Sequence, residues 1–423
     1  MKKKRKIFIL LFVFLLSSYN IFAQAKPNPL QEALLLSYDK LKFYLDNTDS
    51  YHIQIIYSRI EKNSNNNIVV NTYNYNVNSN NYFYPASTVK LPVILLALEK
   101  ANNINKEKEE NVIDIHSPMA TLPSSYCNEA AYLRPNDTNP PCIALYAEKM
   151  LLVSDNPSFA RLYEFLGQKY IQKELQSKKL DSIRIVRRLA SNCYTPEQNA
   201  CTNAVQFYNK NMQLVFKQDE ICNDTIPSPI FSQIPIGKGY IDRFGKYVAN
   251  PLDFSKDNFM SLSQLHQILI SAMLPSSNKA LFALTQKDYQ FLWRYMGAYP
   301  REGSLSNYTP QNGYFDAYKK YLLYGQNPNA AILPNVRIFN IVGLAYGFTT
   351  DSAYIVDFEN NIAFFLSATI YTNKNGILND NSYEYASEAM PFMKILGESI
   401  YKYELAKSKK YNNNLKKYNL FKN

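Results

Sequence analysis

The chain has few of the residues on which many enzymes depend. Its 423 residues include three histidines, five cysteines, one tryptophan and 12 glycines. No G-x-S-x-G elbow is present, and the histidines (His52, His116 and His266) do not lie beside one. These absences exclude a Ser-His-Asp hydrolase. No C-x-x-C pair or His/Cys cluster is found, so we expect no metal and no other cofactor.

Acidic residues are also fewer than basic ones, which gives a formal charge of +11. Five of these charges lie in residues 2–6, and another basic cluster lies in the Asn-rich tail 407–423. No basic and aromatic residues interleave in a known nucleic-acid motif, so we expect no nucleic-acid partner. The composition of the tail is typical of a disordered segment.

The first 25 residues have the pattern of a secretory signal peptide. A basic start precedes the apolar run Ile7 to Leu16 and the small residues near Ala23 to Ala25. This run is too short for a comfortable membrane span, and no other segment has 18 continuous apolar residues. We therefore expect an exported protein, periplasmic or otherwise outside the cytoplasm, with no stable membrane insertion after cleavage.

A serine and a lysine at helical spacing are the strongest chemical signal. Ser87 and Lys90 occur in Ser-Thr-Val-Lys, which leads into the apolar run 91–98. They would lie one turn apart on one helix face, with Ser87 at the helix start. Desolvation would lower the pKa of Lys90 and let its amine act as a base without histidine. The alternative is a capping serine beside a solvated lysine.

The S-x-x-K pattern by itself is weak, because it also occurs at Ser37 to Lys40 and at Ser276 to Lys279. Neither copy leads into an apolar helix. A second element, Ser154-Asp155-Asn156, occurs once and favours the copy at Ser87. Its alternative interpretation is helix capping, with Pro157 in the first turn. Capping and catalysis are compatible, since a capped loop holds its side chains still.

The order, spacing and helical context of these two motifs resemble the serine β-lactamases, class A above all, and the penicillin-binding proteins. The resemblance implies that Ser87 is the nucleophile, Lys90 its general base and Ser154 a proton relay. Asn156 would hold a substrate amide and contact Lys90. The substrate would be a β-lactam or a peptidoglycan-derived compound.

The third motif of that family, K-T-G, is altered. The strand from Arg337 aligns so that Ile341-Val342-Gly343 replaces it. Gly343 still permits close backbone approach, and the Leu344 N–H would complete the oxyanion hole with that of Ser87. Arg337 lies on the same strand face as Ile341 but about 13 Å away, too far to replace the lysine directly. Because the lysine is lost, we expect weak binding of ordinary β-lactams or a different substrate.

A base for deacylation is also hard to find. The family's E-x-x-L-N has its nearest counterpart in 195–199, where Glu197 is displaced by two residues. A solvated loop glutamate is the alternative interpretation of Glu197. Without such a base an acyl-enzyme would be long-lived.

The pattern of elements predicts an α+β fold. Strands are expected at 51–60, 68–77, 337–342, 350–358 and 362–371, and helices at 30–45 and 385–406. Strands from both ends would form one five-stranded antiparallel sheet flanked by the terminal helices. The catalytic domain would span 26–406, with a mainly helical subdomain inserted at about 91–330.

Export makes disulfides plausible for the five cysteines. Cys127 with Cys142, Cys193 with Cys201, and Cys201 with Cys222 are the pairings considered, and one thiol is left over. Three functions stay open: a β-lactamase-type hydrolase, a D-alanyl-D-alanine peptidase or esterase on the same site, and a non-catalytic binding protein. The oligomeric state is not predicted.

Overall fold

The computed structural model describes residues 27–65, 67–134, 137–191, 193–224, 227–275, 280–407 and 415–421. The predicted signal peptide 1–25 and the third S-x-x-K copy, Ser276 to Lys279, lie outside the described residues. No helix in the described ranges is long and apolar enough to cross a membrane.

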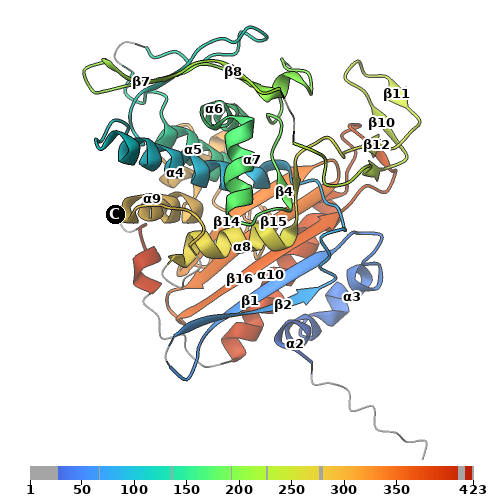
Figure 1. Cartoon of the computed structure of the whole chain (residues 1–423). Helices are drawn as coiled ribbons and strands as arrows, with labels where there is room; N and C mark the ends of the chain where they lie inside the picture. Colours follow the sequence, from blue (N-terminus) through green and yellow to red (C-terminus); the bar gives the residue numbers. More distant parts are fainter. Residues whose placement is uncertain are drawn as a thin grey trace, which may run out of the picture.

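A five-stranded antiparallel sheet forms the middle layer of the molecule (Figure 1). Its strand order is β14-β15-β16-β1-β2. The bounds are β1 Gln54–Lys62, β2 Ile68–Tyr75, β14 Val336–Ala345, β15 Phe348–Asp357 and β16 Ile362–Tyr371. Strands β1 and β16 pair, with Tyr57 opposite Leu366. The predicted sheet, built from both ends of the chain, is therefore confirmed, and β14 is an edge strand.

The terminal helices cover one face of this sheet (Figure 1). They are α2 Pro29–Leu35, α3 Tyr38–Asp46 and α10 Met390–Ala406. The prediction of a single first helix is wrong, because Ser37 (φ −133°) leaves the helical conformation between α2 and α3. The last helix starts with a π-helical turn, Tyr385–Ala389. Pro391 lies in the first turn of α10, a position in which proline is tolerated.

Helices of the inserted subdomain cover the other face. They are α4 Lys90–Lys108, α5 Ile143–Val153, α6 Asn156–Leu166, α7 Gln168–Ser177, α8 Leu262–Met273 and α9 Gln286–Gly297. Helix α8 packs directly on the sheet, where His266 lies between Ser58 of β1 and Ser367 of β16 at 2.8 and 2.7 Å. The predicted helical subdomain is thus present, and the first half of its apolar helix α4 is buried.

Short strands also occur, most of them within the subdomain that we predicted to be mainly helical. They are β3 Met119–Thr121, β4 Ile183–Arg184, β5 Cys201–Thr202, β6 Val205–Tyr208, β7 Leu214–Gln218, β8 Ile221–Cys222, β9 Pro235–Ile236, β10 Gly239–Ile241, β11 Tyr247–Val248, β12 Leu252–Asp253, β13 Phe259–Met260 and β17 Ile377–Leu378. Most have two or three residues, too few to show a sequence period.

The disulfides correct two of the pairings considered. Cys127 pairs with Cys193, and Cys201 pairs with Cys222. Cys142 is a buried free thiol that begins α5, where its Sγ accepts the Leu145 N–H at 3.4 Å. The third pairing considered, Cys201 with Cys222, is confirmed.

The tail is ordered where it is described, which corrects the prediction of a disordered segment for that part. Leu415–Tyr418 form a 3₁₀ turn, and both end residues are buried. The Tyr418 hydroxyl donates to the Met273 carbonyl, and its ring contacts Trp293 of α9 at 4.8 Å. The composition of the tail did not predict this turn, because only Leu415 and Tyr418, three residues apart, are buried in it.

Candidate active site

Ser87 lies where the sequence predicts it, at the entry to α4. A 3₁₀ turn, Ala86–Val89, precedes the helix, and Lys90 is the first α-helical residue. The Lys90 amine donates to Ser87 Oγ at 2.8 Å. Lys90 is fully buried, although its helix begins close to the surface of the subdomain. The alternative of a solvated lysine beside a capping serine is therefore wrong.

The second motif lies against the same amine. Helix α5 ends in Ser154, which adopts a left-handed conformation (φ 61°), and Asp155 caps α6 by accepting the Ser158 N–H at 2.8 Å. Lys90 Nζ lies 2.9 Å from Ser154 Oγ and 2.7 Å from Asn156 Oδ1. Capping and contact with Lys90 thus occur in one turn, which fixes the directions of both side chains.

Burial decides the protonation of Lys90. Removal from water lowers its pKa to about 7, and the nearby Asp155 carboxylate raises it only in part. About half of the amines are then neutral at pH 7. A neutral amine 2.8 Å from a serine hydroxyl can accept its proton, so the geometry and charge suit general-base chemistry.

The altered third motif lies beside the Ser87 turn, but it lacks the positive charge of the family's lysine. A Cβ on Gly343 would lie 2.5 Å from the Pro85 carbonyl oxygen, so only glycine lets β14 approach the Ser87 turn. Ile341 is fully buried in the apolar core. Arg337 forms an ion pair with Glu302, with nitrogen–oxygen distances of 2.8 and 2.9 Å, so its guanidinium is already engaged.

Ser87 opens into a cavity of about 440 Å³. Its lining includes four tyrosines, three asparagines and no charged residue: Tyr84, Ala86, Ser87, Asn156, Leu189, Ala190, Leu344, Ala345, Tyr346, Asn379, Asn381, Tyr383 and Tyr385. Leu344 is there as predicted. Glu197 is exposed and does not line the cavity, so the structure does not bring it to Ser87.

The tyrosines around the cavity were missed by the sequence analysis. The chain has 35 tyrosines, which hides four functional candidates among many others. Tyr84 packs edge-on against Tyr346 at 4.8 Å, and the Tyr385 hydroxyl accepts the Gly347 N–H at 2.8 Å. These contacts fix the β14–β15 turn beside Ser87.

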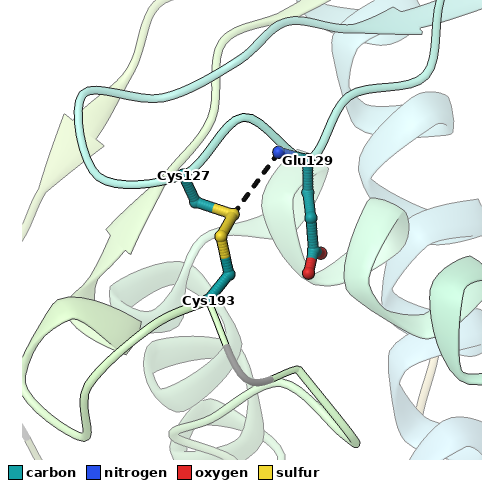
Figure 2. Close-up of side chains that lie close together, drawn as sticks. All are labelled: Cys127, Glu129 and Cys193. Atoms are coloured by element: carbon teal, nitrogen blue, oxygen red, sulfur yellow. Dashed lines mark hydrogen bonds between the residues drawn. A yellow bond between two sulfur atoms is a disulfide. The ribbon is translucent and has the colours of Figure 1, made fainter.

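One group of side chains has the composition of a metal site. Figure 2 shows Cys127, Glu129 and Cys193 close together. The two sulfurs form a disulfide, and Cys127 Sγ accepts the Glu129 N–H at 3.4 Å. A disulfide offers no thiolate to a cation, so one carboxylate is left and these three residues do not fit a metal.

Comparisons with known proteins agree with the motifs. Residues 60–223 match the model of the beta-lactamase enzyme family, a segment that contains Ser87, Lys90, Ser154 and Asn156. A sequence comparison with curated proteins finds no match. The relation to serine β-lactamases and penicillin-binding proteins that the motifs predict is therefore confirmed. This segment is similar to the beta-lactamase enzyme family, which supports hydrolase activity.

Solved structures were also compared. A β-lactamase from Sphaerobacter thermophilus is 10% identical, with a TM-score of 0.44, and covers 89% of this chain and 100% of its own. A class A β-lactamase from Clostridium kluyveri is 12% identical, with a TM-score of 0.46 and coverages of 86% and 100%. The chromosome-encoded β-lactamase of Vibrio parahaemolyticus is 13% identical, with a TM-score of 0.44 and coverages of 86% and 99%. With identities and TM-scores this low, these similarities carry no information about the residues of the site.

Proposed function

We propose that this protein is an exported serine hydrolase that forms an acyl-enzyme at Ser87. The observation that carries the proposal is the position of Lys90 Nζ, which contacts Ser87, Ser154 and Asn156 at 2.7 to 2.9 Å. A nucleophile, its base and a hydroxyl able to pass the proton onward are therefore in direct contact. The N-terminal signal pattern and the two disulfides support export.

The acylation step balances with these groups alone. Ser87 Oγ attacks the carbonyl carbon while its proton passes to the neutral Lys90 amine. The Ser87 N–H, with that of Leu344 on the edge strand, would stabilise the negative oxygen. Lys90 then returns the proton through Ser154 to the leaving nitrogen as the carbon–nitrogen bond breaks. Asn156 would hold the substrate amide.

Deacylation lacks an evident base. Among the described residues no carboxylate lines the Ser87 cavity, and Leu189 and Ala190 present apolar groups instead. Glu129 lines a neighbouring cavity that shares Asn156, but Arg161 and Ser191 hold its oxygens at 3.4 and 3.2 Å. We therefore infer that acylation outpaces hydrolysis. This observation favours the second candidate, a penicillin-binding D-alanyl-D-alanine peptidase or esterase.

The substrate class follows from the family and the cavity. A β-lactam or a peptidoglycan-derived amide is the proposed acyl donor. Because the lining carries tyrosines and amides but no cation, it suits an uncharged ligand group better than a free carboxylate.

Intact-mass spectrometry of the mature protein with a penicillin tests the proposal. We expect an adduct of the drug's mass that is absent in Ser87→Ala and that persists for many minutes. Ser37→Ala, in another described S-x-x-K copy, is the matched control and should keep the adduct. A short-lived adduct with hydrolysed drug would indicate a true β-lactamase. No adduct with a penicillin, a peptide or an activated ester would refute the proposal and leave the binding protein.

A further inference from the structure

A second buried lysine lies behind the active site. Lys319 belongs to the segment between α9 and β14, has φ 59° and is only 5% exposed. Its amine donates to the Leu151 carbonyl at 2.9 Å and to the Met150 carbonyl at 3.2 Å. Neither contact belongs to a motif that the sequence analysis identified.

These two carbonyls belong to the last turn of α5, directly before the serine of the second motif. Ser154 ends that helix, and its N–H also donates to the Met150 carbonyl, at 3.1 Å. Lys319 and Ser154 therefore share one acceptor. Carbonyls in the last turn of a helix are short of intrahelical donors and carry partial negative charge, and the Lys319 amine supplies a donor to both of these. Lys319 thus holds in place the turn that directs Ser154 toward Lys90.

The charges around Lys319 couple it to Lys90. Burial lowers the pKa of Lys319 well below its usual range, and the amines of Lys90 and Lys320 lower it further, while Asp351 raises it. Lys320 binds the Ile338 carbonyl at 2.7 Å and Asn340 at 2.8 Å, away from α5. Lys90 faces Asp155 from the other side, and Asp155 pairs with Lys149 at 3.6 Å. A proton on Lys90 therefore disfavours a proton on Lys319, while burial and Asp155 set the pKa of Lys90 itself.

We propose that Lys319 is a positioning residue for the acylation step. The third motif has no lysine, because Ile341 stands at that position of β14, and Lys319 provides a lysine beside the site from the segment before the strand. It does not line the Ser87 cavity, so it acts through Ser154 and Lys90 rather than on the substrate. This inference rests on the proposed acyl-enzyme function. It explains how the second motif keeps its geometry although the third motif has lost its charge.

The test compares acylation by a chromogenic cephalosporin from pH 5.5 to pH 9 in the wild type, Lys319→Met and Lys319→Arg. In Lys319→Met the acylation rate at saturation should fall by about 10- to 100-fold, with little change in the concentration that gives half of that rate. The acid limb of the pH profile, where the rate falls as Lys90 gains a proton, should move upward by about one unit. The α5 turn that Lys319 no longer holds would admit water to Lys90 and weaken the desolvation that lowers its pKa. Lys319→Arg should restore part of the rate and the limb.

Lys100→Met is the matched control. Lys100 is a partly buried lysine that likewise binds a carbonyl near the end of a helix, Phe165 of α6, at 2.5 Å. Its loss should lower the melting temperature without moving the acid limb. If Lys319→Met does not fold, Lys319→Gln takes its place and must show the same shift.

The outcomes separate the two proposals. A wild type that no cephalosporin, peptide or activated ester acylates refutes the function, and the role of Lys319 with it. If the wild type is acylated and a folded Lys319→Met has the same rate and the same acid limb, the role of Lys319 alone is refuted. A lower melting temperature with an unmoved limb would show a purely structural lysine and would also overturn the inference.

Discussion

Two regions border Ser87: the junction of α4 with the α5–α6 turn, and the edge strand β14. They differ in which residues of the family's motifs they keep. At the junction every side chain that the resemblance implies is present and in contact with Lys90. On β14 the lysine and hydroxyl positions hold Ile341 and Val342, and only Gly343 is kept. The strand therefore keeps the glycine that allows its close approach to Ser87, but it lacks the positive charge of the motif's lysine.

Packing explains this difference. Gly343 must approach the Pro85 carbonyl, so a side chain there would push the strand from the serine turn. Ile341 faces the core shared with the helical subdomain, and Val342 faces the core under α10. Their replacement by apolar residues is stable by itself and affects only ligand charge recognition. Four changes would break or sharpen this comparison.

The largest effect is expected for Ser87→Ala, at the junction. Removing the hydroxyl that the proposed mechanism uses to attack should abolish covalent labelling by any β-lactam or activated ester. Intact-mass spectrometry over one hour measures it. Labelling that survives in Ser87→Ala would show that another side chain is the nucleophile and that the junction is not the reactive site.

A smaller loss is expected for Lys90→Met, which fills the same space without a base. Acylation at pH 7 should fall by about 10²- to 10⁴-fold, the usual contribution of general-base catalysis. In the wild type the neutral amine is the active form, so the rate should rise as pH increases through about 7, the pKa of Lys90. Stopped-flow acylation across pH measures both. A flat profile below pH 9 would exclude Lys90 as the base.

A gain is expected for Ile341→Lys on β14. If this position faces the ligand as the motif register requires, a penicillin with a free carboxylate should be acylated about tenfold faster relative to its methyl ester. The ester is the internal control, because it lacks the charge while sharing the same core. The wild type should acylate with the methyl ester at least as fast as with the free acid, because no cation is among the described residues that line its cavity. An unchanged ratio in a folded variant would refute the register.

The smallest effect on acylation is expected from the disulfides. Loss of Cys201–Cys222, which are 21 residues apart, should lower the free energy of unfolding by about 3 kcal/mol. Acylation should stay within about twofold, since neither cysteine lines the cavity. Urea unfolding of Cys201→Ser/Cys222→Ser measures the first quantity. Cys142→Ala is the control, because burial raises the pKa of that free thiol and keeps it unreactive.

Local patterns predicted the fold best where they were long and regular. The strand at 362–371 has the predicted bounds, and the others differ by a few residues at their ends. The first helix was predicted as continuous because its apolar spacing runs across Ser37. The short strands between α7 and α8 and the buried turn 415–418 were missed, since each depends on contacts with distant segments.

The sequence by itself located the proposed nucleophile, its lysine and the serine–asparagine pair, because these residues lie within one helical turn of one another or within one capped turn. It also determined that β14 carries no charged side chain at positions 341 and 342. Only the tertiary structure decided the tyrosine lining of the cavity, the disulfide partners and the place of Lys319. Those features join residues far apart in the chain, and what brings them together is burial of the shared core, which no local spacing records.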